Sequence, residues 1–225
     1  MKLINNYISE KLIINKNTKF HYNYFPERID ELDDLVDNLI EERGNNCDLN
    51  DIDVSQIKDF SFLFLNSKFN GDISQWNVSN ATTMYKMFYN SVFNGNISSW
   101  DVSSVKDFRY TFSYSKFNND ISNWDVSNVT HMANMFEKSK FNQDISKWDV
   151  HNVKDMYEMF DRAEFNQNIS SWNVSNVEDM RYMFSESKFD QNISKWKLSN
   201  NCETYNMFIH SPLEGKEREW WGRIK

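Results

Sequence analysis

The chain has 225 residues, of which 16% are aromatic, with only five glycines and two prolines. This composition excludes a disordered or collagen-like chain, and the formal net charge of −8 argues against nucleic acid or an anionic membrane as the main partner. No window approaches the run of about 18 apolar residues that a membrane span needs.

The N-terminal region predicts a small cap. Residues 1–19 lack the apolar run of a secretory signal, so as given the protein is expected to stay in the cytoplasm. Residues 11–25 predict two strands around Asn15–Asn17. The stretch from Pro26 to Gly44 predicts a helix, with Pro26 in its first turn and Gly44 at its exit. Residues 1–47 are therefore expected to form an N-terminal hairpin and cap helix.

A strict repeat follows the cap. Tryptophan recurs every 24 residues, at Trp76, Trp100, Trp124, Trp148, Trp172 and Trp196. A constant period of this size is typical of a solenoid or propeller. Residues 48–208 therefore predict a solenoid of about seven turns. Residues 209–225, with Trp220 and Trp221, are expected to cap its C-terminal end, because a solenoid must cover the apolar ends of its stack.

Each turn is expected to contain one short strand and one short helix. Ile121-x-x-Trp124-x-Val126 has the spacing of a leucine-rich repeat, which places Trp124 and Val126 inward on a strand and Asp125 outward. Apolar residues then follow at the three- and four-residue spacing of a helix stripe: Val129, Met132, Met135 and Phe136. A serine such as Ser127 is placed to cap that helix, with acidic residues such as Asp107 in its first turn. The predicted class is an α/β repeat solenoid with terminal caps.

Three polar columns repeat as faithfully as the core. They are headed by Asn70, Asp72 and Ser74, each recurring every 24 residues as Asn, Asp or Ser with few exchanges. One interpretation is a polar ligand track, and the other is a hydrogen-bonded ladder that satisfies backbone groups. The ladder is favoured, because a binding site seldom needs identical residues at every level.

An outward column on the predicted strand face is the candidate binding surface. Asp101, Asp125 and Asp149 are adjacent there, at a spacing of about 4.8 Å, and repel one another unless a cation or basic partner relieves them. The alternative is a solvated acidic face with screened charges. Because of the aspartates, a basic protein partner is the expectation, and Lys147 and His151 flank this column. Seven tyrosines lie beside the predicted helix stripe, where packing between neighbouring turns or an interface would explain them: Tyr85, Tyr89, Tyr110, Tyr114, Tyr157, Tyr182 and Tyr205.

Motifs of catalysis and metal binding are not found. The four histidines have no ligand partner at metal-site spacing, and there is neither a phosphate-binding glycine loop nor a nucleophile elbow. Repeated carboxylates occupy matching environments, whereas a catalytic pair needs unlike ones. Cys47 and Cys202 should lie about 30 Å apart, too far for a disulfide. No enzymatic activity, cofactor or metal is expected.

The repeat FNxDISxWDVSNVxDMxxMF resembles that of the BspA-like leucine-rich-repeat proteins, a bacterial group also found in some large viruses. The resemblance covers residues 25–208 and implies a right-handed solenoid that binds proteins, often on a cell surface and sometimes in adhesion. The surface members carry a signal peptide and an anchor, which are not seen in this sequence.

The leading functional hypothesis is a non-enzymatic protein-binding scaffold that uses the strand face. The alternatives are a structural protein that self-associates through its caps or its tyrosine-bearing side, and an acidic decoy of a nucleic-acid-binding protein. Salt dependence separates them, because binding to a decoy should weaken steeply with ionic strength.

Overall fold

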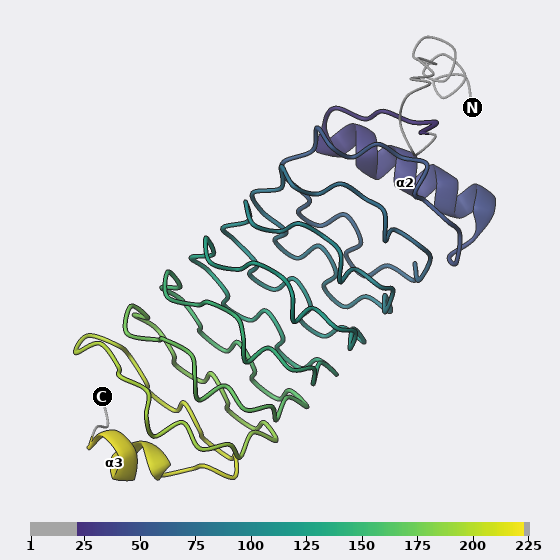
Figure 1. Cartoon of the computed structure of the whole chain (residues 1–225). Coiled ribbons are helices and arrows are strands. Elements are labelled where there is room, and N and C mark those ends of the chain that lie inside the picture. Colours follow the sequence, from purple (N-terminus) through teal and green to yellow (C-terminus); the bar gives the residue numbers. More distant parts are fainter. Residues whose placement is uncertain (1–21, 223–225) are drawn as a thin grey trace.

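A computed structural model describes residues 22–222 of the chain. Each 24-residue repeat winds into one coil, and the coils stack along one axis between two helices (Figure 1). These helices are α2, Ile29–Arg43, and α3, Lys216–Trp221. Within residues 22–222 the remaining secondary structure consists of turns, bends and isolated bridges.

Backbone hydrogen bonds join each coil to the next along one side of the stack. In the coil of residues 69–92, four alternate N–H groups donate to carbonyl oxygens 23 residues ahead. Met84 bonds Asp107 at 3.0 Å and Phe88 bonds Thr111 at 2.9 Å, for example. The same side carries a row of parallel bridges that joins Asp59, Thr83, Asp107, His131, Asp155, Asp179 and Glu203. The backbone of one coil is therefore satisfied largely by its neighbours.

This bonded side replaces the helix that the spacing predicts. Residues 84–91 form successive turns, in which Met87 N–H donates to Met84 and Ser91 N–H donates to Phe88. The third residues of these turns, Lys86 and Asn90, have φ of 55° and 52°, as type II turns require. An α-helix with its side chains is about 10 Å wide, whereas equivalent phenylalanine rings in adjacent coils are 5.7 Å apart. A helix in every coil would not fit that spacing.

The predicted strand is also displaced. Trp124 and Val126 are buried and Asp125 is exposed, as the alternation predicts. However, no bridge forms at these residues, and the row of six parallel bridges runs through the position of Asp107. Asp107 therefore lies in a bridge rather than in a first helical turn, and Ser127 is not a helix cap. Instead, Ser127 N–H donates to Asp125 Oδ1 at 3.0 Å.

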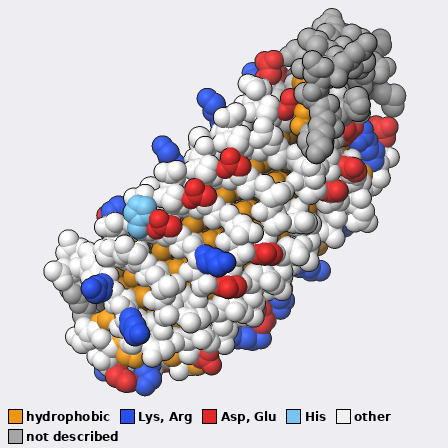
Figure 2. All heavy atoms as spheres, viewed as in Figure 1, with side chains coloured by type: hydrophobic (Ala, Val, Ile, Leu, Met, Phe, Trp, Pro, Cys, Tyr) orange, Lys and Arg blue, Asp and Glu red, His pale blue; other side chains and the backbone are white. Residues whose placement is uncertain are grey.

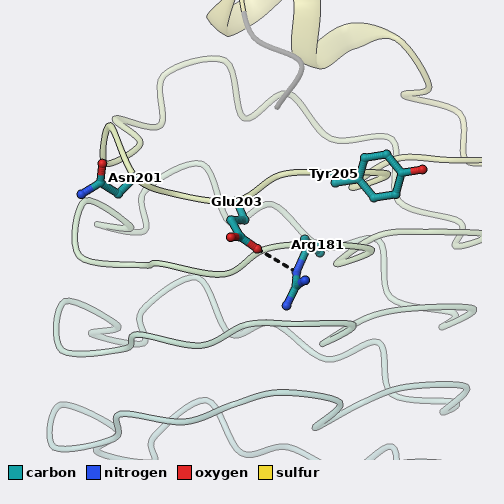
Figure 3. A pocket seen from close by; sticks show the side chains of 4 residues that line it. All are labelled: Arg181, Asn201, Glu203 and Tyr205. Carbon is teal, nitrogen blue, oxygen red and sulfur yellow. Dashed lines mark ion pairs between the residues drawn. The ribbon is translucent and has the colours of Figure 1, made fainter.

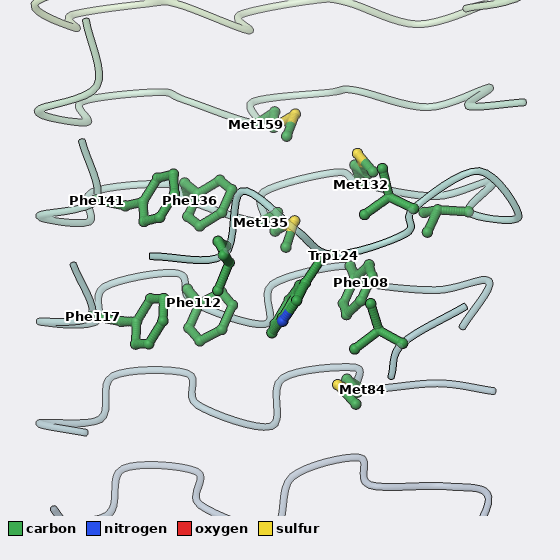
Figure 4. Packing of buried hydrophobic residues seen from close by; sticks show 14 of the residues in the cluster. Met84, Phe108, Phe112, Phe117, Trp124, Met132, Met135, Phe136, Phe141 and Met159 are labelled. Atoms are coloured by element: carbon green, nitrogen blue, oxygen red, sulfur yellow. The ribbon is translucent and has the colours of Figure 1, made fainter. Parts of the chain in front are cut away.

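The core consists of columns of like side chains. Equivalent phenylalanines stack in two neighbouring columns, so that Phe112 lies 5.7 Å from Phe136 and Phe117 lies 6.2 Å from Phe141. Figure 4 shows these two pairs one above the other, with Trp124 beside them and with Met84 and Met159 in the layers below and above. Each tryptophan of the repeat also donates from Nε1 to a carbonyl oxygen of the preceding coil, as from Trp124 to Ile97 at 3.0 Å. The tryptophan column thus supplies both apolar burial and a bond between coils.

Both ends of the stack are covered. Helix α2 buries Leu32, Val36 and Leu39, and Gly44 N–H closes its last turn on Ile40 O. The helix begins at Ile29, so Pro26 precedes it instead of occupying its first turn. At the other end, Trp221 of α3 lies over Phe208 with ring centroids 6.3 Å apart.

Some expectations on the termini fall outside residues 22–222. The predicted hairpin lies mostly there, although Tyr24 forms a parallel bridge with Ile52. Cys47 and Cys202 are free thiols, as predicted. Neither α2 nor α3, the helices of the described residues, has the length and apolar character of a membrane-spanning helix.

Candidate functional site

The acidic column of the sequence prediction is exposed in the structure. Asp101, Asp125 and Asp149 are one coil apart, and Figure 2 shows acidic side chains spaced along the stack, one beside a histidine. Each carboxylate also serves its own backbone, because Oδ1 accepts the N–H two residues on, as Asp101 does from Ser103 at 3.1 Å. Bonds from the Ser127 hydroxyl and N–H hold the pKa of Asp125 below its usual value. These aspartates therefore shape local turns as well as presenting charge.

The two residues predicted to flank this column have different surroundings. Lys147 is exposed. Bonds from the Ser146 N–H and hydroxyl lower the pKa of Asp144, and the charge of Lys147 lowers it further. His151 contacts Asp149 directly, with Nδ1 2.8 Å from Oδ1. The structure thus brings His151 and Asp149 together as a pair.

The other polar columns form a hydrogen-bonded ladder, as favoured from the sequence. Asn118 N–H donates to Asn94 Oδ1 at 2.7 Å, and Asn142 N–H donates to Asn118 Oδ1 at 2.8 Å. In the second column Asp120 Oδ1 accepts Ser122 N–H at 2.8 Å. These side chains satisfy backbone donors at each level, which explains why the residue types repeat.

The outward residues of the turns form a different kind of surface, which we call the turn face. It consists of residues 61–66 and the equivalent segments at each later coil. Near α2 it carries a group of large aromatic and apolar side chains, the aromatic cluster, defined as Phe62, Leu65, Tyr85, Tyr89, Tyr110 and Tyr114. Ring centroids lie 5.2 Å apart for Phe62–Tyr85, 5.9 Å for Tyr85–Tyr110 and 5.4 Å for Tyr89–Tyr114. The cluster therefore spans three successive coils.

Lys86 lies at the middle of the aromatic cluster. Its Nζ is 5.3, 5.4 and 4.8 Å from the ring centroids of Tyr85, Tyr89 and Tyr110. Cations held over aromatic faces are attracted by the ring quadrupole. Sequence reasoning noted these tyrosines but missed Lys86, because the residues that surround it come from two coils.

Further along the turn face the character changes from aromatic to acidic. Carboxylate oxygens of Glu137, Glu158 and Asp161 all lie within 4.8 Å of one another. Burial, together with the nearby carboxylates of Glu158 and Glu137, raises the pKa of Asp161. Such a trio could hold a cation, but protein donors already serve it: Asn134 Nδ2 bonds Glu158 at 2.8 Å, and Arg162 pairs with Asp161 at 3.4 Å. No signal in the sequence predicts this cluster, because its members occupy two different columns.

A shallow pocket lies near the C-terminal end of the stack, lined by Arg181, Asn201, Glu203 and Tyr205. Figure 3 shows Arg181 and Glu203 facing each other, with Asn201 and Tyr205 on opposite sides of them. The guanidinium bonds Asp179 at 2.6 Å and Glu203 at 3.1 Å. Because two carboxylates already pair with it, the guanidinium offers no free positive charge to a ligand in this pocket.

Comparison with known protein families gives one match. Residues 33–140 and 113–220 both match a family described as "Mycoplasma protein of unknown function, DUF285". Together these matches cover most of the chain, which therefore belongs to this family of tandem-repeat proteins. Neither the curated proteins nor the solved structures gave a match to the chain.

Proposed function

We propose that this protein is a non-enzymatic scaffold, a right-handed repeat solenoid like those of the BspA-like proteins, that binds a protein partner through its outward side chains. The observation that supports this most is the contrast between inward and outward columns. The inward tryptophans are identical in six successive coils. By contrast, one outward column of the turn face reads Phe62, Lys86, Tyr110, Asn134, Glu158, Tyr182 and Asn206.

Such variation fits recognition better than folding. Main-chain groups bond to one another along the turn face. Its outward side chains are therefore not needed to satisfy the backbone. Repeat stacks present extended surfaces of this kind to partners. Aromatic residues and arginine are the types enriched at protein interfaces, and both occur on this face.

The strand-face hypothesis is tested by changing Asp101, Asp125 and Asp149 together to Asn. Asn77 and Asn173 occupy the same column and accept the same turn bonds, at 3.2 and 3.3 Å, so the fold should hold. If this acidic column binds a basic partner, the triple variant should capture less of that partner from cell extract at low salt than the wild type does, chiefly through a slower on-rate. Unchanged capture with an unchanged melting temperature would exclude the acidic column as the binding surface.

Two further outcomes distinguish the alternative functions. Self-association of the purified protein, measured by sedimentation, would favour the assembly role. Capture that collapses steeply with salt and recovers nucleic-acid-binding proteins would favour the decoy role. Most of the net negative charge of the chain lies outside the acidic column, because residues 26–44 contain eight Asp or Glu and two Arg.

A further inference from the structure

The aromatic cluster exposes large hydrophobic side chains to solvent. Four large hydrophobic residues are exposed in the described part of the chain, and three belong to the cluster: Phe62, Leu65 and Tyr114, at 48%, 38% and 40% exposure. Contiguous exposed apolar patches of this kind mark interaction sites. The fourth, Tyr205, lies at the opposite end of the stack.

The backbone conformation of these residues is unfavourable for the side chains they carry. Phe62, Tyr110 and Tyr114 have φ of 69°, 59° and 58°, a region in which bulky residues are strained and asparagine is tolerated. Other coils do use asparagine there. Asn134 occupies the column of Phe62 and Tyr110, and Asn90 occupies that of Tyr114. Strain that the fold could avoid is a reason to look for function.

The charge at the centre of the cluster is not matched by the protein itself. On the rest of the turn face, Arg109, Lys138, Arg162 and Arg181 each pair with a carboxylate, at 2.6 to 3.4 Å. No ion pair is found for Lys86 among the described residues, and its Nζ contacts tyrosine rings instead. Locally the stack is also not acidic, because residues 69–116 contain four Lys or Arg and three Asp or Glu.

We propose that the aromatic cluster is a docking surface for an acidic peptide segment of a partner protein, in which a carboxylate pairs with Lys86 and neighbouring apolar side chains cover Phe62 and Tyr114. This inference rests on the proposed function and names the surface and the partner chemistry for it. The charge complementarity is local, so binding depends on contact rather than on long-range steering by a chain of net charge −8.

The surface has a defined extent along the stack. Beyond Tyr114 the next coil places Ala133 and Asn134 at the equivalent outward positions, and both are buried. Lys138 then contacts the Tyr114 ring at 4.4 Å and pairs with Glu137. An extended segment lying across three coils would span about 10 Å along the stack at about 4.8 Å per coil, which is about three or four residues.

The test measures fluorescence anisotropy of labelled peptides with the full-length protein. The probe is a twelve-residue peptide of alternating Glu and Leu, with matched Gln–Leu, Lys–Leu and Glu–Gly peptides as comparisons. We expect the Glu–Leu peptide to bind at least about tenfold more tightly than each of the other three, since one lost contact of about 1.4 kcal/mol is a tenfold change. Equal binding of the Gln–Leu peptide would overturn the role of Lys86, and equal binding of the Glu–Gly peptide would overturn that of the rings.

Variants of the protein separate binding from folding. Phe62→Asn and Tyr114→Asn should each lower the affinity for the Glu–Leu peptide about tenfold. The melting temperature should stay level or rise, because asparagine relieves the backbone strain. Lys86→Gln should weaken it similarly without unfolding. Tyr182→Asn is the matched control, since Tyr182 shares the column of Phe62 and its positive φ of 58° but lies outside the cluster. Loss of binding that only follows a lower melting temperature would refute the proposal.

Three other outcomes would also decide against it. Displacement of the peptide by heparin at equal concentration would assign the cluster to an anionic polysaccharide. A dimer that Phe62→Asn abolishes would assign it to a second copy of this chain. If no peptide binds while the wild type and the Phe62→Asn, Tyr114→Asn and Lys86→Gln variants all capture the same partner from extract, the proposed function stands and this site fails.

Discussion

At the scale of single residues, the repeated tryptophan both packs in the core and bonds to the backbone of the preceding coil. Trp124 is 3% exposed and donates from Nε1 to Ile97 O at 3.0 Å. A phenylalanine could fill much of the same space but could not make that bond. This explains why the position is tryptophan in six coils, while the core position of Met84, Phe108 and Met132 accepts more than one apolar type.

Substitution of this residue tests the two contributions. Trp124→Ala should lower the free energy of unfolding by about 3–5 kcal/mol, as expected for a buried aromatic residue. Trp124→Phe should lower it by about 1–3 kcal/mol, through the loss of one hydrogen bond and of part of the ring's packing. Ile97 O keeps its other bond, from Trp100 N–H at 3.2 Å. Urea denaturation measures both values. A cost under about 0.5 kcal/mol for Trp124→Phe would show that the bond adds nothing beyond packing.

The buried carboxyl of Asp161 should make stability depend on pH. Its pKa is raised by burial and by Glu158 and Glu137, so the folded protein binds this proton more tightly than the unfolded chain. The protonated carboxyl's contribution to the free energy of unfolding is fully present below the unfolded pKa of about 3.9. It is lost as the pH rises through the pKa of the folded state. At neutral pH the ionised group therefore destabilises the fold.

Asp161→Asn removes this effect. We expect a higher melting temperature at pH 7 and a flatter profile from pH 7 down to about 4. Asp125→Asn is the control with the opposite sign, because the pKa of Asp125 is lowered and its stabilisation is lost as the pH falls. If the Asp161→Asn variant has the same pH profile of stability as the wild type, the bond from Ser185 and the charge of Arg162 already compensate the carboxylate.

At the scale of elements, the sequence predicts which residues point inward but not how the backbone between them is built. Met132, Met135 and Phe136 are buried, as their spacing predicts. That spacing fits a helix, but consecutive turns that repeat every four residues place the same side chains inward. The hydrogen bonds decide between the two, and they run to a neighbouring coil 23 residues away, which a local pattern cannot reveal.

The candidate site follows the same division. The acidic column could be predicted, because a strict period aligns Asp101, Asp125 and Asp149 at adjacent levels. The surroundings of Lys86 and the trio around Asp161 could not, since each depends on residues in unlike columns of two coils. The tyrosines were visible in the sequence, but their exposure and positive φ are properties of the folded turns.

The cap helix supplies a prediction at this scale. Deleting residues 1–44 removes α2 and with it Leu32, Val36 and Leu39, which cover the first coil. The exposed apolar end should cause dimerisation or aggregation, measured as a rise in sedimentation coefficient relative to the full chain. Glu41→Gln with Glu42→Gln changes only exposed positions of α2 and should sediment like the wild type. A monomeric, folded deletion variant would contradict the cap role.

At the scale of the whole molecule, each coil contacts its immediate neighbours and little else. The backbone bonds between coils connect residues 23 to 25 positions apart, and the ring stacks join equivalent residues one period apart. In such stacks, stability is approximately a sum of terms for each unit and each interface between neighbours. The length of the array is then adjustable in steps of one period, and only in those steps.

Removal of one period tests this additivity. Deleting residues 165–188 joins Glu164 to Phe189, which restores the repeat in register, so the protein should fold and unfold cooperatively with a lower urea midpoint. Deleting residues 165–176 removes half a period and places Asn192 and Lys195 at the buried positions of Met180 and Met183. That variant should lose the near-ultraviolet circular dichroism signal of packed tryptophans. Equal loss of structure in both variants would mean that the stack folds as a single indivisible unit, with coupling that extends well beyond adjacent coils.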